Sequence, residues 1–184
     1  EFYTTYTPYQ AEASQGSLQV IYEFQSAMTE LMAMEVSNAS LYDGSTALAE
    51  AVLMAVRIMR SKKTHILVPT HLHPHYRTVL KTLTQHQAIQ LIDLPFDEET
   101  GILSPNNCRQ YFDNDTAAII IPQPNFFGTL EPIDELTDLA HQHGALVIAQ
   151  VNPLAVSWLK PPGEWGEMGA DIACGEGQPL GVPL

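Results

Sequence analysis

Small polar residues gather at one predicted helix start and give this chain its clearest chemical signal. They are Asp43, Gly44, Ser45 and Thr46, and an apolar run follows them. The first N–H groups of a helix have no helical acceptor, and this end carries a partial positive charge. The pattern therefore predicts a site for a phosphate or carboxylate. A simple helix cap is the alternative interpretation, because caps of this composition are common.

A second group of polar donors surrounds Pro8 near the start of the sequence. It comprises Tyr6, Thr7, Tyr9 and Gln10. The Tyr and Gln side chains donate hydrogen bonds without carrying charge, which suits a substrate carboxylate or a cofactor phosphate. The alternative is a plain turn, for which proline with flanking aromatic residues is typical.

Patterns of apolar residues predict the elements that would position these side chains. Short apolar runs predict strands, and runs with three- and four-residue spacing predict helices. The predicted helices cover residues 17–34, 44–59, 74–86, 104–112 and 133–143. The predicted strands cover residues 65–69, 89–94, 116–121, 145–149 and 171–174. We expect Ser104 to cap its helix and Pro122 to close the third strand.

The alternation of strands and helices predicts an α/β fold built on a mostly parallel sheet. Ligands of such folds lie at the carboxyl ends of the strands. The chain has 184 residues, enough for one domain with a substantial core. We therefore expect residues 1–184 to form a single domain.

Composition narrows the classes of partner. The net charge of −13 disfavours binding to nucleic acid. No run of about 18 apolar residues occurs, so the sequence predicts no membrane span. The two cysteines, Cys108 and Cys174, are typical of a protein of the reducing cytoplasm.

Six runs of residues resemble the glycine dehydrogenase (decarboxylating) family, the P-protein of the glycine cleavage system. The similarity is greatest to subunit 1 of the form that is split over two chains. The resemblance implies a fold-type-I, pyridoxal-phosphate-dependent large domain with helices on both faces of the sheet, and a longer polypeptide of which this chain is a fragment. The runs are Tyr6–Gln10, Ser14–Gly16, Asn38–Asp43, His73–Tyr76, Gly169–Ile172 and Gly181–Leu184.

The residues that such a catalyst needs are replaced in this chain. In the catalytic half of the family, the Schiff-base lysine follows a strand that begins Gly-Ala-Asp-Ile. The matching position here is Pro179, preceded by Gln178. The carboxylate that pairs with the pyridinium nitrogen is replaced by Gln150 or Asn152. We therefore assign no catalytic residue to this chain and expect the partner subunit to hold pyridoxal phosphate (PLP) covalently.

The resemblance also implies roles for the polar residues. Gly44, Ser45 and Thr46 match the phosphate cradle of fold-type-I enzymes, and Asn125 matches the asparagine that touches the cofactor ring. The residues around Pro8 would reach a substrate site shared across the subunit interface, or would only form that interface.

The implied activity is the decarboxylation of glycine, with transfer of the aminomethyl group to the lipoyl arm of the H-protein. The lysine-bearing P-protein subunit 2 would be the partner, in a cytoplasmic heterotetramer. A non-catalytic pseudo-subunit that only stabilises this partner is the alternative. A doubly wound nucleotide-binding domain is disfavoured, because neither GxGxxG nor GxxxxGK[ST] occurs.

Three histidines two residues apart, His71, His73 and His75, could suggest a metal site. Their spacing does not match a helical ligand pair, and no cysteine or acidic cluster accompanies them. We therefore expect no metal and favour a structural or interface role.

Overall fold

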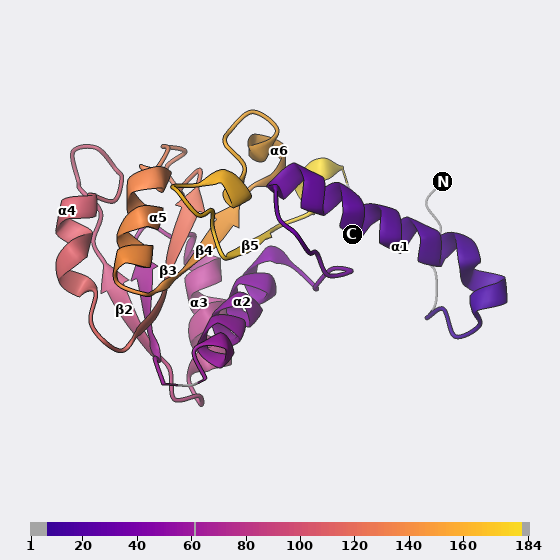
Figure 1. Cartoon of the computed structure of the whole chain (residues 1–184), viewed down its shortest axis with the longest axis horizontal. Coiled ribbons are helices and arrows are strands. Elements are labelled where there is room, and N and C mark those ends of the chain that lie inside the picture. The colour runs from indigo at the N-terminus through magenta and orange to yellow at the C-terminus, as the bar shows by residue number, and fades with distance from the viewer. Residues whose placement is uncertain (1–6, 61, 182–184) are drawn as a thin grey trace.

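A five-stranded parallel sheet forms the centre of the computed structural model, which describes residues 7–60 and 62–181 (Figure 1). The strand order is β2-β1-β3-β4-β5, and every neighbouring pair is parallel. This confirms the predicted parallel sheet. The strands are β1 (His65–Pro69), β2 (Gln90–Leu94), β3 (Thr116–Gln123), β4 (Leu146–Val151) and β5 (Ile172–Gly175).

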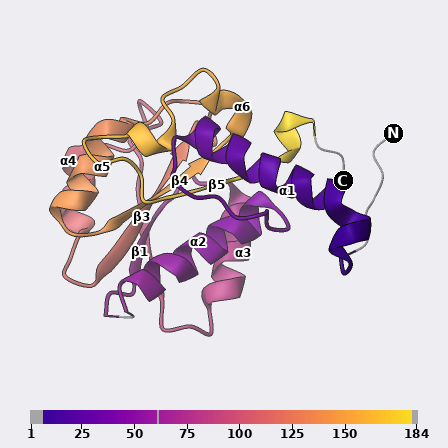
Figure 2. The ribbon, with the colours of Figure 1, turned by 45° about the vertical axis from the view of Figure 1, so that its right-hand side comes forward.

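Helices cover both faces of the sheet, as expected (Figures 1 and 2). On one face lie α2 (Gly44–Ile58) and α3 (Pro74–Thr84), which pack on β1 and β3 through Leu48, Val52 and Leu80. On the other face lie α4 (Pro105–Cys108) and α5 (Ile133–Gln142). Shorter elements join them: η1 (Arg109–Tyr111), α6 (Pro153–Val156), η2 (Pro162–Glu164) and η3 (Gln178–Leu180).

The central strand β3 is buried along its whole length. Successive side chains of a strand point to opposite faces of the sheet. Ile119 therefore joins the hydrophobic cluster that includes α5, and Ile120 joins the cluster that includes α2. A continuous apolar run is what such a doubly covered parallel strand requires.

Strand β3 continues past Pro122, so the prediction that this proline closes the strand is wrong. The carbonyl of Gln123 accepts from the Asn152 N–H on the β4 side. Because neighbouring residues point to opposite sides, the nitrogen of Pro122 faces the β1 side. The pairing with β1 ends at Ile119, so no ladder bond is lost at the proline.

Helix α1 (Ala11–Met32) begins six residues before its predicted start and has no buried residue. Its first turns reach away from the sheet and its helices (Figures 1 and 2). Only its carboxyl end touches the core, through Leu31 and Met32. The apolar spacing therefore predicts the helix correctly, although none of its apolar side chains is fully buried within the described residues.

A helix begins at Pro105, as predicted, but the expected hydrogen bond from the Ser104 side chain to the helix start is not formed. Ser104 occupies the cap position without a side-chain hydrogen bond.

Across residues 7–60 and 62–181, each helix is too short or too polar to span a lipid bilayer.

Candidate functional site

The amino end of α2 is closed by a reciprocal cap. Asp43 Oδ1 accepts from the Thr46 N–H at 2.7 Å, and the Thr46 hydroxyl lies 3.2 Å from the Asp43 nitrogen. The Ser45 hydroxyl also donates to Asp43, at 2.7 Å. These bonds, the Thr46 N–H first, hold the pKa of Asp43 below its usual value. The capping interpretation of this sequence is therefore confirmed.

A second carboxylate reaches the same helix end from the far side of the sequence. Glu176 follows β5, and its Oε2 accepts from the Gly44 N–H at 3.0 Å. Its Oε1 accepts from the Gln178 N–H at 3.2 Å. The parallel order of the sheet brings the end of β5 beside the start of α2, because both lie at the carboxyl edge of the strands.

Tyr76 packs against the same point from α3. A Cβ placed on Gly44 would lie 2.2 Å from the Tyr76 hydroxyl oxygen and 3.0 Å from the Glu176 nitrogen. Only glycine fits such a close approach. Burial first, then the negative charge of Glu176, raises the pKa of Tyr76 to about 12.

The Tyr76 phenol gives a measurable signature of this arrangement. We expect Glu176→Gln to move the pKa of Tyr76 down toward 10, because it removes a charge that opposes the phenolate. Burial and the charges of Cys174 and Asp43 remain. Ultraviolet titration of each protein, with its Tyr76→Phe counterpart subtracted, isolates this phenol. An unchanged Tyr76 pKa would contradict the expectation.

The same group predicts how stability depends on pH. The pKa is higher in the folded chain than in the unfolded chain, so the unfolded state releases this proton first as the pH rises. The contribution of Tyr76 to the free energy of unfolding is complete below pH 10 and is lost between about pH 10 and 12. The Tyr76→Phe protein should lack this part of the alkaline loss.

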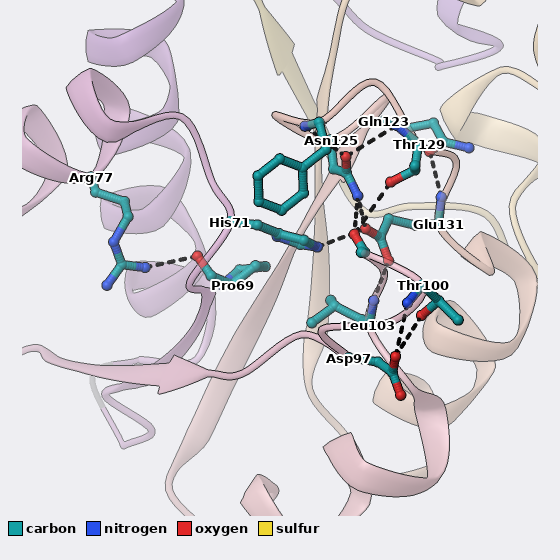
Figure 3. A network of polar contacts seen from close by, with 12 residues as sticks. Pro69, His71, Arg77, Asp97, Thr100, Leu103, Gln123, Asn125, Thr129 and Glu131 are labelled. Carbon is teal, nitrogen blue, oxygen red and sulfur yellow. Dashed lines mark hydrogen bonds and ion pairs between the residues drawn. The ribbon is translucent and has the colours of Figure 1, made fainter.

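A buried polar network occupies the neighbouring strand ends (Figure 3). Glu131 accepts from His71 Nε2 at 2.8 Å, from Asn125 Nδ2 at 2.6 Å and from the Leu103 N–H at 2.7 Å. The side chains of His71 and Glu131 are completely buried. The Glu131 N–H in turn donates to Gln123 Oε1 at 2.9 Å. The network thereby joins the segments that follow β1 and β3 to the loop that precedes α4.

The Asn125 side chain forms several hydrogen bonds within this network. Its Nδ2 donates to the Gly101 carbonyl at 2.8 Å as well as to Glu131. Its Oδ1 accepts from the N–H groups of Phe127 and Thr129. Both amide hydrogens are thus used inside the chain, and contact of Asn125 with a cofactor ring stays a prediction.

The three histidines have separate roles. His71 is buried and stacks on Phe96 with ring centroids 5.2 Å apart. His73 is exposed, and its Nδ1 accepts from the His75 N–H at the start of α3. Within the described residues, no three His, Cys, Asp or Glu side chains are grouped so that they could hold a metal ion.

The loop around Pro8 does not join the residues at the sheet edge. Tyr6 lies outside the described residues. Thr7, Tyr9 and Gln10 are exposed and precede α1, beyond the body of the molecule (Figure 1). Their role at a shared substrate site or interface stays a prediction.

The position matched to the Schiff-base lysine lies just beyond β5. Pro179 sits in η3 there. The Lys160 ammonium pairs with Asp134 at 2.8 Å, and Lys63 donates to the Gly144 carbonyl at 2.6 Å. Asn152 uses its side chain to cap α6.

Three residues of this edge were missed in the sequence: Glu131, Glu176 and Tyr76. Glu131 and Glu176 follow strands β3 and β5, and this location is the only local signal that could have marked them. Their partners are set by contacts between distant parts of the chain.

Comparisons with known sequences agree on one family. The sequence model of the family described as glycine cleavage system P-protein matches residues 1–184. A curated relative from Coxiella burnetii (strain Dugway 5J108-111), named probable glycine dehydrogenase (decarboxylating) subunit 1, is 63% identical over 184 residues. The chain spans 41% of the length of that relative.

Solved structures confirm the predicted fold class. Glycine decarboxylase (P-protein) of the glycine cleavage system, in inhibitor-bound form, matches 98% of this chain with a TM-score of 0.86 and 41% identity; the match covers 39% of that protein. C-DES with glycine covalently linked to its PLP cofactor matches 92% of this chain and 44% of its own, with a TM-score of 0.66 and 16% identity. The second likeness is one of fold alone.

Proposed function

Because the chain belongs to the glycine cleavage system P-protein family, we propose that it is part of subunit 1 of a glycine dehydrogenase (decarboxylating). The identity of 63% along the whole chain to a protein of that name carries the proposal. The assembled enzyme would release CO2 from glycine and pass the aminomethyl group to the lipoyl arm of the H-protein.

The absence of a lysine at the end of β5 supports a division of labour. Pro179 stands at the matched position, and proline cannot form an imine. We therefore assign covalent PLP to the lysine-bearing subunit 2. When bound there, PLP supplies an electron sink for the electron pair that decarboxylation leaves behind.

The cofactor phosphate does not fit the α2 start of this chain as it stands. The Gly44 N–H already donates to Glu176, and the Thr46 N–H donates to Asp43. The predicted contacts of Gly44, Ser45 and Thr46 with PLP are therefore left to experiment, and we derive no catalytic step through them.

The part of this chain in substrate binding would fall to the exposed loop before α1. Thr7, Tyr9 and Gln10 offer uncharged polar groups that could orient a carboxylate across a subunit interface. We place the enzyme in the cytoplasm as part of the same proposal, since Cys108 and Cys174 are both free thiols.

The first test is the absorbance of added PLP. The full-length subunit alone should give no Schiff-base band that borohydride can trap. Addition of the lysine-bearing subunit should give that band, and glycine with lipoylated H-protein should then give CO2. A trappable band on this subunit alone would overturn the division of labour.

A second test concerns the loop. In the assembled enzyme, Tyr9→Phe and Gln10→Ala should lower turnover while the complex, measured by size-exclusion chromatography, stays intact. Loss of assembly instead would make the loop part of a scaffold, and unchanged turnover would remove it from the substrate site.

A further inference from the structure

The amino end of α2 is already occupied by acids of this chain. Its first N–H, from Gly44, donates to Glu176, and its third, from Thr46, donates to Asp43. The N–H of the cap residue, Asp43, donates to the Thr46 hydroxyl oxygen at 3.2 Å. Three of the four N–H groups that a helix start offers to an external anion are therefore engaged.

Both carboxylate oxygens of Glu176 accept backbone hydrogen bonds. One carboxylate oxygen lies 3.0 Å from the Gly44 nitrogen, and the other lies 3.2 Å from the Gln178 nitrogen. These bonds connect β5 and η3 to α2 across 132 residues of sequence. The carboxylate has the charge and the acceptor geometry that this helix end would otherwise find in a phosphate.

No cation offsets the two acids among the described residues, where Asp43 and Glu176 make no ion pair with Lys or Arg. Arg77, which follows Tyr76 on α3, instead donates to the Pro69 carbonyl at 2.7 Å and pairs with Asp93. An incoming phosphate would therefore meet two negative charges and no ammonium or guanidinium group.

The Cα of Gly44 is also closely packed. The Tyr76 hydroxyl and the Glu176 backbone lie so close to Gly44 that even a methyl group would collide with them. The pKa of Tyr76, raised to about 12, agrees with a buried phenol beside a carboxylate.

We propose that Glu176 is an internal occupant of the anion seat at the start of α2, which closes this helix end to phosphate-bearing ligands. The seat comprises the N–H groups of Gly44, Ser45 and Thr46. Replacement of Glu176 removes one of the two negative charges at these N–H groups, and Glu176→Ser also removes the side chain that accepts from the Gly44 N–H. This inference does not depend on glycine chemistry, because phosphate itself is the ligand tested.

Equilibrium dialysis with radiolabelled inorganic phosphate tests the proposal on the full-length subunit, followed by PLP as the larger probe. The proteins are the wild type, Glu176→Gln, Glu176→Ser and the control Glu50→Gln. Glu50 is exposed on the same helix, about 9 Å further along its axis. The control therefore removes the same charge without touching the seat. Circular dichroism verifies that each variant is folded.

The expected result is weak phosphate binding by the wild type and by Glu50→Gln, and at least about tenfold tighter binding by the two Glu176 variants. Equal affinity in all four proteins would overturn the proposal. An equal gain in Glu50→Gln would also overturn it, because net charge and not the seat would then control binding. Either result leaves the Schiff-base test of the enzyme's function untouched.

Discussion

Replacement of Glu131 by alanine is expected to lower the free energy of unfolding by about 3–5 kcal/mol, because it breaks a buried pair by removing one partner. The donors from His71, Asn125 and Leu103 would lose their shared acceptor inside the protein. An unpaired buried donor keeps its full desolvation cost. Urea denaturation of the full-length subunit measures the loss.

The matched control is Glu135→Ala, four residues away at the exposed start of α5. It removes the same side chain where water can replace it, so we expect a change within about 0.5 kcal/mol. Similar losses in both variants would show that Glu131 contributes no more than an ordinary surface acid.

The second large effect is expected at Trp165. This side chain is completely buried in the hydrophobic cluster that includes α5, and it donates its indole N–H to the Lys160 carbonyl at 3.0 Å. Trp165→Ala should lower the free energy of unfolding by about 3–5 kcal/mol, because it leaves a cavity and an unpaired carbonyl. Urea denaturation again provides the measurement.

Trp158 supplies the comparison within the same segment, since it is 92% exposed. Trp158→Ala should change the free energy of unfolding by less than about 0.5 kcal/mol. If both substitutions lowered the free energy of unfolding equally, the buried position assigned to Trp165 would be wrong.

Local patterns were enough to predict most of the sheet. The five apolar runs became five parallel strands, and β1 has the predicted bounds, His65–Pro69. The errors arose where a neighbour decides the outcome. Pro122 continues β3 because the facing strand has already ended. Helix α1 has no fully buried residue within the described part of the chain, although its spacing is amphipathic.

The candidate site likewise has one part that local sequence determines and another that only the fold creates. The cap formed by Asp43 and Thr46 joins residues only three positions apart, so the sequence by itself determined it. Only the tertiary structure placed Glu176 on Gly44, 132 residues away, and His71 on Glu131, 60 residues away. A residue pattern records which groups are near one another along the chain. The order of the strands decides which loops meet at the edge of the sheet, and therefore which acid meets which donor.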